Sequence, residues 1–578
     1  MASGSTKVPG RYTALALGVA VGRQLGAEWR VSVLRRALLA GPRPEGLAAS
    51  PRDLRPADLE NGHRILAGAL VFGGETLAIG LRGDPWDRAS PSRRFAVALH
   101  QFDWLRDLTA LGDAGAAEGL RLTLEWRRKF GRWNAFSWSP EVLEQRVFNL
   151  ACAARAICAK ASDAETSQIA GDLARQARFL LGSGDGPARA TERAVAAAVA
   201  AATLGGRAGE KLLWQALRRL THALPDSLSH DGGHASRSPQ AALELLFNLT
   251  TLDDALAQRG LAAPEEMIRA MDRLALAVRF FTLADGRLAA FQGGEALSAS
   301  YVAAARAQDT GGERVMPPYR NGYHRLEARS LQLVADAAPP APGLWSVTAC
   351  AQPLAIEVLA GGRRLIVGGG WTPQSHGQQA LRLVDAASTL SVGDAACGQP
   401  LRGFPARVLG PRLYGAYDEV EARRHEAPGA LWLELAHPGW APVFGFRHER
   451  RLYIDATADE LRGEDRLSPL QERGPRNTDG RRFVAVALRF HLHPEVSALV
   501  ARDRTSVLLK ADGEGSGWWL RSDAAEVTLE PSTYHQNGQT RRSQQIVLRC
   551  QARLDAGARV RWKLSAARSD FRDAENRV

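Results

Sequence analysis

Apolar residues recur every three or four positions from about residue 95 to residue 285, which is the period of amphipathic helices. Two of these helices have clear starts, because Ser139 and Ser238 are N-cap residues and a proline follows each at the first helical position. Pro264 opens another helix, which stops near Gly286. Consecutive amphipathic helices with short connections predict an all-helical domain built from helix pairs.

After about residue 315, apolar and polar residues alternate in short segments that are rich in β-branched and aromatic residues. Turn residues separate one segment from the next. The segments are LWLELAH, RLYID, RFVAVALRFHLHP, TSVLLKA, GWWLRSD, AEVTLEP, SQQIVLRC and ARVRWKLS. This pattern is typical of an antiparallel β-sandwich.

The chain of 578 residues is too long for one hydrophobic core, so two or three domains are expected. We place an N-terminal segment with a helix and loops at residues 1–94, the helical domain at 95–315 and the β-domain at 316–578. Residues 61–90, which contain GGE and GDPWD, are expected to be rich in loops.

The N-terminus has the outline of a signal peptide, because Lys7 and Arg11 precede the apolar run TALALGVAVG. Arg23 follows at once, however, and the chain continues with the amphipathic pattern RVSVLRRALLAG. We therefore expect an ordinary N-terminal helix, and export stays open. No segment approaches the roughly 20 apolar residues that span a bilayer, so no transmembrane segment is expected.

The net charge of +12 favours a polyanionic partner or simply keeps the protein in solution. It is not enough to predict nucleic-acid binding. The five cysteines are odd in number and include no CxxC pair, so they fit neither a disulfide framework nor a zinc ribbon. The sequence leaves the oligomeric state open.

The segment DGGHASRSP, residues 231–239, places His234 and Arg237 directly before a helix N-terminus. The unpaired N–H groups and the positive dipole end of a helix suit an anion, so a carboxylate or phosphate could be held there. A helix-capping loop with a solvated histidine and arginine explains the segment equally well.

Near the domain boundary, RNGYHRL sets Arg320, Tyr323 and His324 side by side. Tyrosine and histidine are common proton-transfer residues, and clefts between domains are favoured binding places. At the start of a strand, the same residues are more often structural.

The stretch WRRKFGRWNAFSWSP interleaves Trp126, Trp133 and Trp138 with arginines. Aromatic faces beside guanidinium groups suit acidic sugars or single-stranded nucleic acid. Packing of a helix pair is the alternative, and it accounts for at least one of the tryptophans.

The stretch RFHLHPEV, residues 489–496, holds His491 and His493 on one face of an expected strand, with Phe490 and Leu492 on the other. Two histidines can ligate a metal, but no third ligand is adjacent, so a structural role is favoured. The sequence has no P-loop, no GxGxxG after a strand, no HExxH and no GxSxG, which leaves the corresponding nucleotide-dependent and hydrolytic chemistries without support.

The order of these parts resembles the heparinase II/III-like family of bacterial polysaccharide lyases. The resemblance rests on DGGHASRSP, FFTLADGRLAAFQGG, LAIEVLAGGRRLIVGGG, VDAASTLSV, HERRLYIDATADELRGEDRL and RFHLHPEV, with ELRGEDRL and RFHLHP the most specific. It implies an incomplete α/α toroid followed by an antiparallel β-sandwich, with the active cleft between them.

The resemblance also implies a lyase that cleaves a uronate-containing acidic polysaccharide by β-elimination, in the bacterial cell envelope or periplasm. His234 and Arg237 would neutralise the uronate carboxylate, and Tyr323 or His324 would act as base and acid. Trp133, Trp138 and Arg320 would bind substrate. No cofactor, no metal and no nucleic acid are expected, and a cytoplasmic location stays open.

Several polar residues that the family carries are replaced in this chain. Cys350 and Ala387 stand where histidines are expected, and Gly368 or Gly369 where an aspartate or similar residue is expected. Ala241 and Ala242 fill the turn that usually holds a tyrosine. The alternative function is therefore a catalytically weakened carbohydrate-binding or cell-envelope assembly protein with the same fold.

Overall fold

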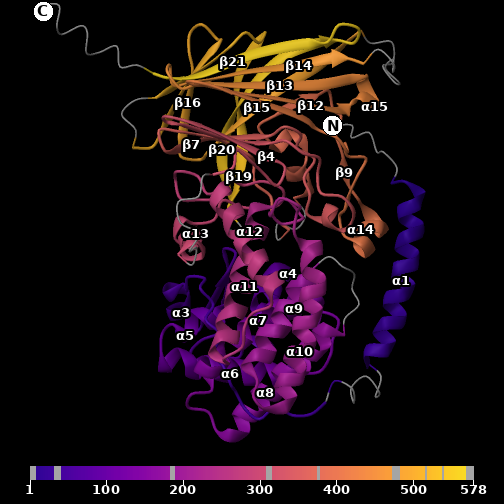
Figure 1. Ribbon diagram of the computed structural model, residues 1–578, viewed down its shortest axis with the longest axis vertical. Coiled ribbons are helices and arrows are strands. Elements are labelled where there is room, and N and C mark those ends of the chain that lie inside the picture. Colours follow the sequence, from indigo (N-terminus) through magenta and orange to yellow (C-terminus); the bar gives the residue numbers. More distant parts are fainter. Residues whose placement is uncertain are drawn as a thin grey trace, which may run out of the picture.

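The computed structural model describes residues 8–31, 39, 41–182, 189–307, 316–373, 378–470, 482–513, 517–536 and 539–567 (Figure 1). Helices fill one half of the molecule, and two antiparallel sheets fill the other. The change from helical to alternating periodicity therefore predicts the order of the two halves correctly.

The helical half runs from α3 to α13. Its elements are α3 (Leu59–Leu66), α4 (Arg93–Gln101), α5 (Trp104–Thr109), α6 (Asp113–Phe130), α7 (Pro140–Ile157), α8 (Asp163–Leu181), α9 (Ala190–Thr203), α10 (Gly206–Ala223), η2 (Leu224–Ser227), α11 (Pro239–Gln258), α12 (Glu265–Phe281) and α13 (Ala299–Arg306). The expected helix starts at Pro140 and Pro239 are confirmed.

Helix α9 lies at the centre of this half, in contact with α7, α8, α10 and α11. Every residue from Ala194 to Ala202 is an alanine or a valine, and all nine are at most 3% exposed. Small side chains let the neighbouring backbones approach closely, so α9 can be surrounded on all sides.

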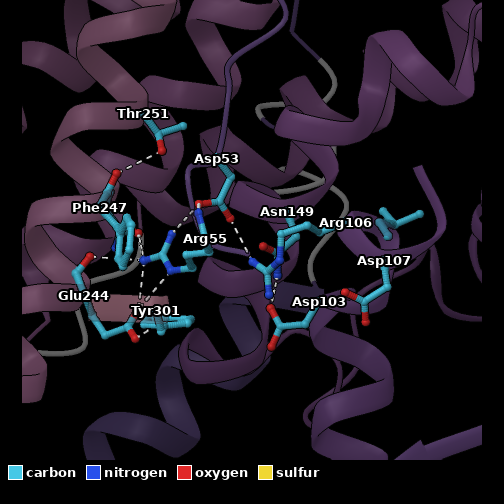
Figure 2. A network of polar contacts seen from close by, with 12 residues as sticks. Asp53, Arg55, Asp103, Arg106, Asp107, Asn149, Glu244, Phe247, Thr251 and Tyr301 are labelled. Carbon is cyan, nitrogen blue, oxygen red and sulfur yellow. Dashed lines mark hydrogen bonds and ion pairs between the residues drawn. The ribbon is translucent and has the colours of Figure 1, made fainter. Parts of the chain in front are cut away.

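The residues before α3 are tied into the helical half by a buried network around Arg55 (Figure 2). Its guanidinium pairs with Asp53 at 2.9 Å and with Glu244 of α11 at 2.8 Å, and donates to Asn248 at 2.7 Å. The hydroxyl of Tyr301 donates to the other carboxylate oxygen of Glu244, at 3.0 Å. This network joins the N-terminal segment to α11 and α13.

The segment expected to be rich in loops contains a β-hairpin, formed by β1 (Ala69–Phe72) and β2 (Glu75–Ala78). Gly73 and Gly74 form its turn with φ of 57° and 84°. A two-residue turn with both φ positive matches the twist of a hairpin, and glycine adopts it without strain. The GGE signal therefore indicates a hairpin as well as a turn.

The expected N-terminal helix is present as α1 (Gly10–Val31), which lies beside the main body (Figure 1). Ala16 packs against Leu401 and Leu409 next to α14 (Gly403–Leu409), and Arg23 donates to the carbonyl of Val408 at 2.6 Å. Among the described residues, no helix combines the length and the apolar character needed to cross a membrane.

The β-half contains an eight-stranded and a nine-stranded antiparallel sheet, besides the short pair of β9 (Gln399–Pro400) and β10 (Leu413–Tyr414). The first has the order β11 (Glu421–Ala427), β12 (Ala430–Trp440), β13 (Phe446–Asp455), β14 (Glu460–Pro469), β21 (Ala558–Ala566), β18 (Trp518–Ser522), β17 (Ser506–Ala511) and β16 (Val496–Val500). The second has the order β19 (Glu526–Gln536), β20 (Gln539–Arg553), β15 (Phe483–Leu492), β7 (Arg363–Val367), β6 (Ile356–Ala360), β5 (Leu331–Asp336), β4 (Tyr323–Ala328) and β3 (Tyr319–Arg320), with β8 (Leu390–Val392) paired to β15. Side chains from both sheets share one apolar core.

A chain of buried hydrogen bonds links three neighbouring strands of the eight-stranded sheet, β12, β13 and β14. His437 Nε2 lies 3.1 Å from His448 Nδ1, and His448 Nε2 lies 2.8 Å from Asp465 Oδ1. The amide of Gly439 donates to His437 Nδ1 at 3.0 Å, so both histidines fit as neutral rings with the proton on Nε2. Burial lowers the pKa of both rings, and Arg450 holds the pKa of Asp465 at about 2 against the effect of burial.

Candidate functional site around His234

The two sequence motifs beside the domain boundary contact each other. The turn of Asn321 and Gly322, between β3 and β4, presses on the loop that precedes α11, and Asn321 Nδ2 donates to the carbonyl of His234 at 3.2 Å. A Cβ atom on Gly233 would lie 2.2 Å from that Nδ2 atom, so the second glycine of DGGH is required by packing. The structure therefore brings DGGHASRSP and RNGYHRL into one place.

His234 is buried, at 2% exposure, with its ring edge-on to Trp345 at 4.9 Å between centroids. The amide of Ser236 donates to Nδ1 at 3.1 Å, and the hydroxyl of Ser236 lies 2.7 Å from the same atom. Because Nδ1 accepts an N–H, the neutral ring carries its proton on Nε2. Nε2 has no hydrogen-bond partner within the described ranges and lies 3.7 Å from Glu192 Oε1.

Glu192, in the first turn of α9, faces His234. Together with Glu144 and Arg189, these two residues form a cluster of acidic and basic side chains. Burial alone would raise the pKa of Glu192, but His234 and Arg189 lower it to about 2. Arg189 also pairs with Glu144 of α7, and 47% of the Arg189 side chain is exposed. Glu144 Oε2 and Glu192 Oε2 accept no hydrogen bond from the described part of the chain. The cluster thus has buried acceptor atoms on Glu144 and Glu192 and a donor on His234. Beside them lies the guanidinium of Arg189, which reaches solvent.

Arg237 uses all five of its N–H donors within the protein. It donates to the carbonyls of Asn321, Gly322, Ala338 and Pro339 and pairs with Asp336 at 2.5 Å. Its guanidinium also lies over the ring of Tyr323, 4.7 Å from the centroid. Binding of a substrate carboxylate by Arg237 stays a prediction, and it would require several of these bonds to break.

Tyr323 and His324 are both buried. The hydroxyl of Tyr323 donates to the carbonyl of Arg237 at 2.9 Å, and burial raises its pKa well above the usual value. Burial, with a smaller contribution from Arg424, lowers the pKa of His324 to about 4, and its ring packs on Tyr319. Their predicted roles as base and acid are untested, and neither shows the pKa near neutrality that suits proton transfer.

Arg320 is half-buried and donates to the backbone carbonyl of Asp231. Trp138 is buried against Phe179, with its indole N–H bonded to the carbonyl of Phe130 at 2.9 Å. Trp133 is half-buried against the same helical core. The substrate-binding role predicted for these residues remains untested, and the contacts of Trp138 are those of a core residue.

His491 lies in β15 and His493 directly follows the strand, while Phe490 and Leu492 point into the sandwich core as expected from the alternation. His491 bonds to the hydroxyl of Ser532 at 2.7 Å and to the carbonyl of Asp385 at 3.0 Å. No group of three or more His, Cys, Asp or Glu side chains suitable for a metal is found among the residues that the structure describes.

Sequence reasoning missed Glu144, Arg189, Glu192 and Trp345. These residues lie on three separate stretches of the chain and meet His234 only through packing of α7, α9 and η3 (Gly343–Val347). Glu192 had one usable signal, because an acidic residue in the first turn of a helix marks the dipole end.

Comparison with known proteins places this geometry in a family. The protein-family model described as heparinase II/III-like, C-terminal, matches residues 320–563. The solved structure of heparinase III is similar with a TM-score of 0.67 at 14% identity, over 96% of this chain and 92% of that one. Heparan sulfate lyase HepC from Pedobacter heparinus gives 0.56 at 13% identity, over 92% and 87%. The chain belongs to the heparinase II/III-like family, and its fold is the predicted α/α toroid followed by a β-sandwich.

A curated relative is much more similar in sequence. FtsZ-localized protein C of Caulobacter vibrioides (strain NA1000 / CB15N) is 51% identical over 543 residues, which is 93% of this chain and 94% of the relative. The name of that protein gives a location and no lyase activity.

Proposed function

We propose that the protein localises with FtsZ and acts there as a binding protein built on the lyase fold. The identity of 51% over nearly the whole of both chains supports a shared location with the Caulobacter relative. We combine this location with the alternative that the replaced family residues suggest, a catalytically weakened protein with the same fold.

The preference for a binding role over catalysis rests on the hydrogen-bonding atoms that His234 and Glu192 present. β-Elimination from a uronate needs a group that removes a proton from carbon. Because Nδ1 of His234 accepts the N–H of Ser236, its Nε2 atom is a donor, and Glu192 presents a buried carboxylate oxygen that has no partner in the described structure. A donor and an acceptor 3.7 Å apart are well suited to hold a hydroxyl group of a ligand.

Imaging tests the location. A fluorescent fusion of the full chain, expressed in its own bacterium beside labelled FtsZ, should follow FtsZ through the cell cycle. The purified chain should also sediment with FtsZ filaments. A fusion whose distribution does not change when FtsZ is depleted would contradict the proposal.

A second candidate function is the predicted cleavage of an acidic polysaccharide. It is favoured by one observation: Glu192 and His234 each have a buried atom without a partner in the described structure, beside the exposed cation of Arg189. Such a cluster could hold a uronate carboxylate and donate a proton to the leaving oxygen.

The two candidates are separated by incubating the protein with a panel of uronate polymers and following the ultraviolet absorbance of the unsaturated product. Product that disappears in His234→Gln and Glu192→Gln, but persists in the surface control Arg466→Gln, would support the lyase. Polymer binding without product would support the binding role. Localisation with FtsZ should be unchanged in all three variants.

A further inference from the structure

A polar cavity lies at the junction of the two halves, between elements that the site around His234 does not use. Its volume is about 220 Å³. It is lined by Asp285, Arg287, Gly362, Arg363, Arg364, His493, Glu495, Ala511 and Asp512. The turn after α12, the start of β7, the β15–β16 connection and the end of β17 therefore all contribute to its wall.

The frame of the cavity is fixed by bonds within the protein. Arg364 pairs with Asp285 at 2.9 Å and with Glu357 at 3.1 Å, so its charge is already neutralised. The amide of His493 donates to the carbonyl of Leu365 at 3.1 Å, and the amide of Asp512 donates to that of Glu495 at 2.9 Å. The side chain of Arg364 and the backbone of the lining at His493, Glu495 and Asp512 are thus held in place before any ligand arrives.

Several polar groups of the lining have no strong partner. His493 is 3% exposed, and its Nε2 atom has no hydrogen-bond partner among the described residues. The guanidinium groups of Arg287, half-buried, and of Arg363, exposed, form no ion pair with the part of the chain that the structure describes. A buried polar atom without a partner is costly, and a small bound molecule would remove that cost.

Two carboxylates complete the charge pattern. Glu495 approaches His493 at 3.8 Å and Arg541 at 3.9 Å, beyond hydrogen-bond distance, and the side chain of Asp512 pairs with no described residue. Apart from the paired Arg364 and Asp285, the lining itself therefore carries two cations, Arg287 and Arg363, and two anions, Glu495 and Asp512. A simple dianion would satisfy the arginines but would be repelled by the carboxylates.

From this pattern we propose that the cavity binds a small zwitterion with the chemistry of a free amino acid. Its carboxylate lies between Arg287 and Arg363, where guanidinium groups form paired hydrogen bonds with planar oxyanions. Its ammonium group faces Glu495 and Asp512, and His493 Nε2 supplies a further hydrogen bond. The cavity is smaller than most pockets for drug-sized ligands, which matches a ligand of this size.

Ligand-observed NMR titration of the full chain tests the proposal with L-alanine and D-alanine as zwitterions. Acetate carries the anion alone, methylamine the cation alone, and inorganic phosphate a different anion. Saturable binding of at least one alanine enantiomer is expected, about tenfold or more tighter than acetate or methylamine. Failure of both enantiomers to bind, or phosphate binding as tightly as alanine, would overturn it.

Two variants assign the two charges of the ligand. Arg287→Gln should weaken both alanine and acetate, whereas Asp512→Asn should weaken alanine and leave acetate unchanged. Arg466→Gln, on the exposed face of β14, is the matched control and should leave all affinities at the parent value. Arg363→Gln, a change at an exposed side chain, replaces Arg287→Gln if that variant shows a lowered melting temperature. Alanine binding that is unaltered in both the arginine variant and Asp512→Asn would contradict the site.

Discussion

Arg237 and Asp336 form a buried ion pair that joins the helical half to the sandwich, with Nη2 of the arginine 2.5 Å from Oδ1 of the aspartate. Arg237 lies in the loop before α11, and Asp336 ends β5. The side chains are 9% and 1% exposed. Arg237, which the sequence analysis predicts to bind a substrate carboxylate, thus binds a carboxylate of its own chain.

Replacing Asp336 with asparagine should lower the free energy of unfolding by about 3–5 kcal/mol, because a buried guanidinium would lose its counter-charge. Urea denaturation followed by circular dichroism measures the loss. Glu434→Gln is the control, since it breaks an ion pair with Arg451 whose side chains are 40% and 58% exposed. That change should cost less than about 1 kcal/mol, and equal losses in the two variants would contradict a structural role for the buried pair.

Tyr323→Phe should destabilise the protein by about 1 kcal/mol, because the carbonyl of Arg237 loses a buried hydrogen bond. The melting temperature and the urea midpoint both report this effect. If stability is unchanged while production of unsaturated uronate falls, the catalytic role predicted from the sequence is favoured instead. Phenylalanine keeps the aromatic ring under Arg237, so the substitution removes the hydroxyl group and leaves the packing of the ring in place.

His491 should make stability depend on pH between about 6.5 and 5. Burial lowers its pKa to about 4 in the folded protein, whereas an unfolded histidine has a pKa of roughly 6.5. The unfolded chain therefore binds more protons in this window, and stability falls as the pH falls through it. The loss for one histidine is about 1.5 kcal/mol between pH 6.5 and pH 5.

The variant His491→Gln isolates this contribution, because other titrating groups are common to both proteins. On going from pH 6.5 to pH 5, the parent should lose about 1.5 kcal/mol of unfolding free energy relative to the variant. His63→Gln, at an exposed position, is the control for the removal of a histidine. A constant difference for His491→Gln would mean that the folded ring titrates normally.

Gly463→Ala should destabilise the sandwich by roughly 1–3 kcal/mol. A Cβ atom at this position would lie 2.1 Å from Cε2 of Trp562, whose indole N–H bonds to Asp465 at 3.0 Å. Gly171→Ala in α8 is the matched control: no atom lies within 4 Å of its added Cβ, and the helix should gain about 0.5–1 kcal/mol. Equal effects of the two changes on the melting temperature would contradict this packing.

Much of the fold could be predicted from periodicity, because a core on one side of a helix or strand leaves its period in the sequence. The starts at Pro140 and Pro239 and the inward face of Phe490 and Leu492 are of this kind. The hairpin around Gly73 was missed because its strands are four residues long and mostly half-buried, so they carry little alternation.

The candidate site could be predicted only in part. The sequence indicates that His234 is special, since it follows two glycines and precedes a helix. It does not show that Arg237 finds its anion 99 positions later, at Asp336, nor that Glu192 of α9 faces His234. Such partners are chosen by three-dimensional packing, which leaves no short-range pattern.

Helix α9 has a consequence for how this sequence can change over time. Where nine consecutive positions hold alanine or valine and all are buried, almost every mutation adds atoms and almost none removes them. Such a segment can accept a larger residue only if a neighbour on α7, α8, α10 or α11 has already become smaller. Drift along this helix should therefore proceed through paired substitutions, and related chains are expected to show compensating size changes on the surrounding helices.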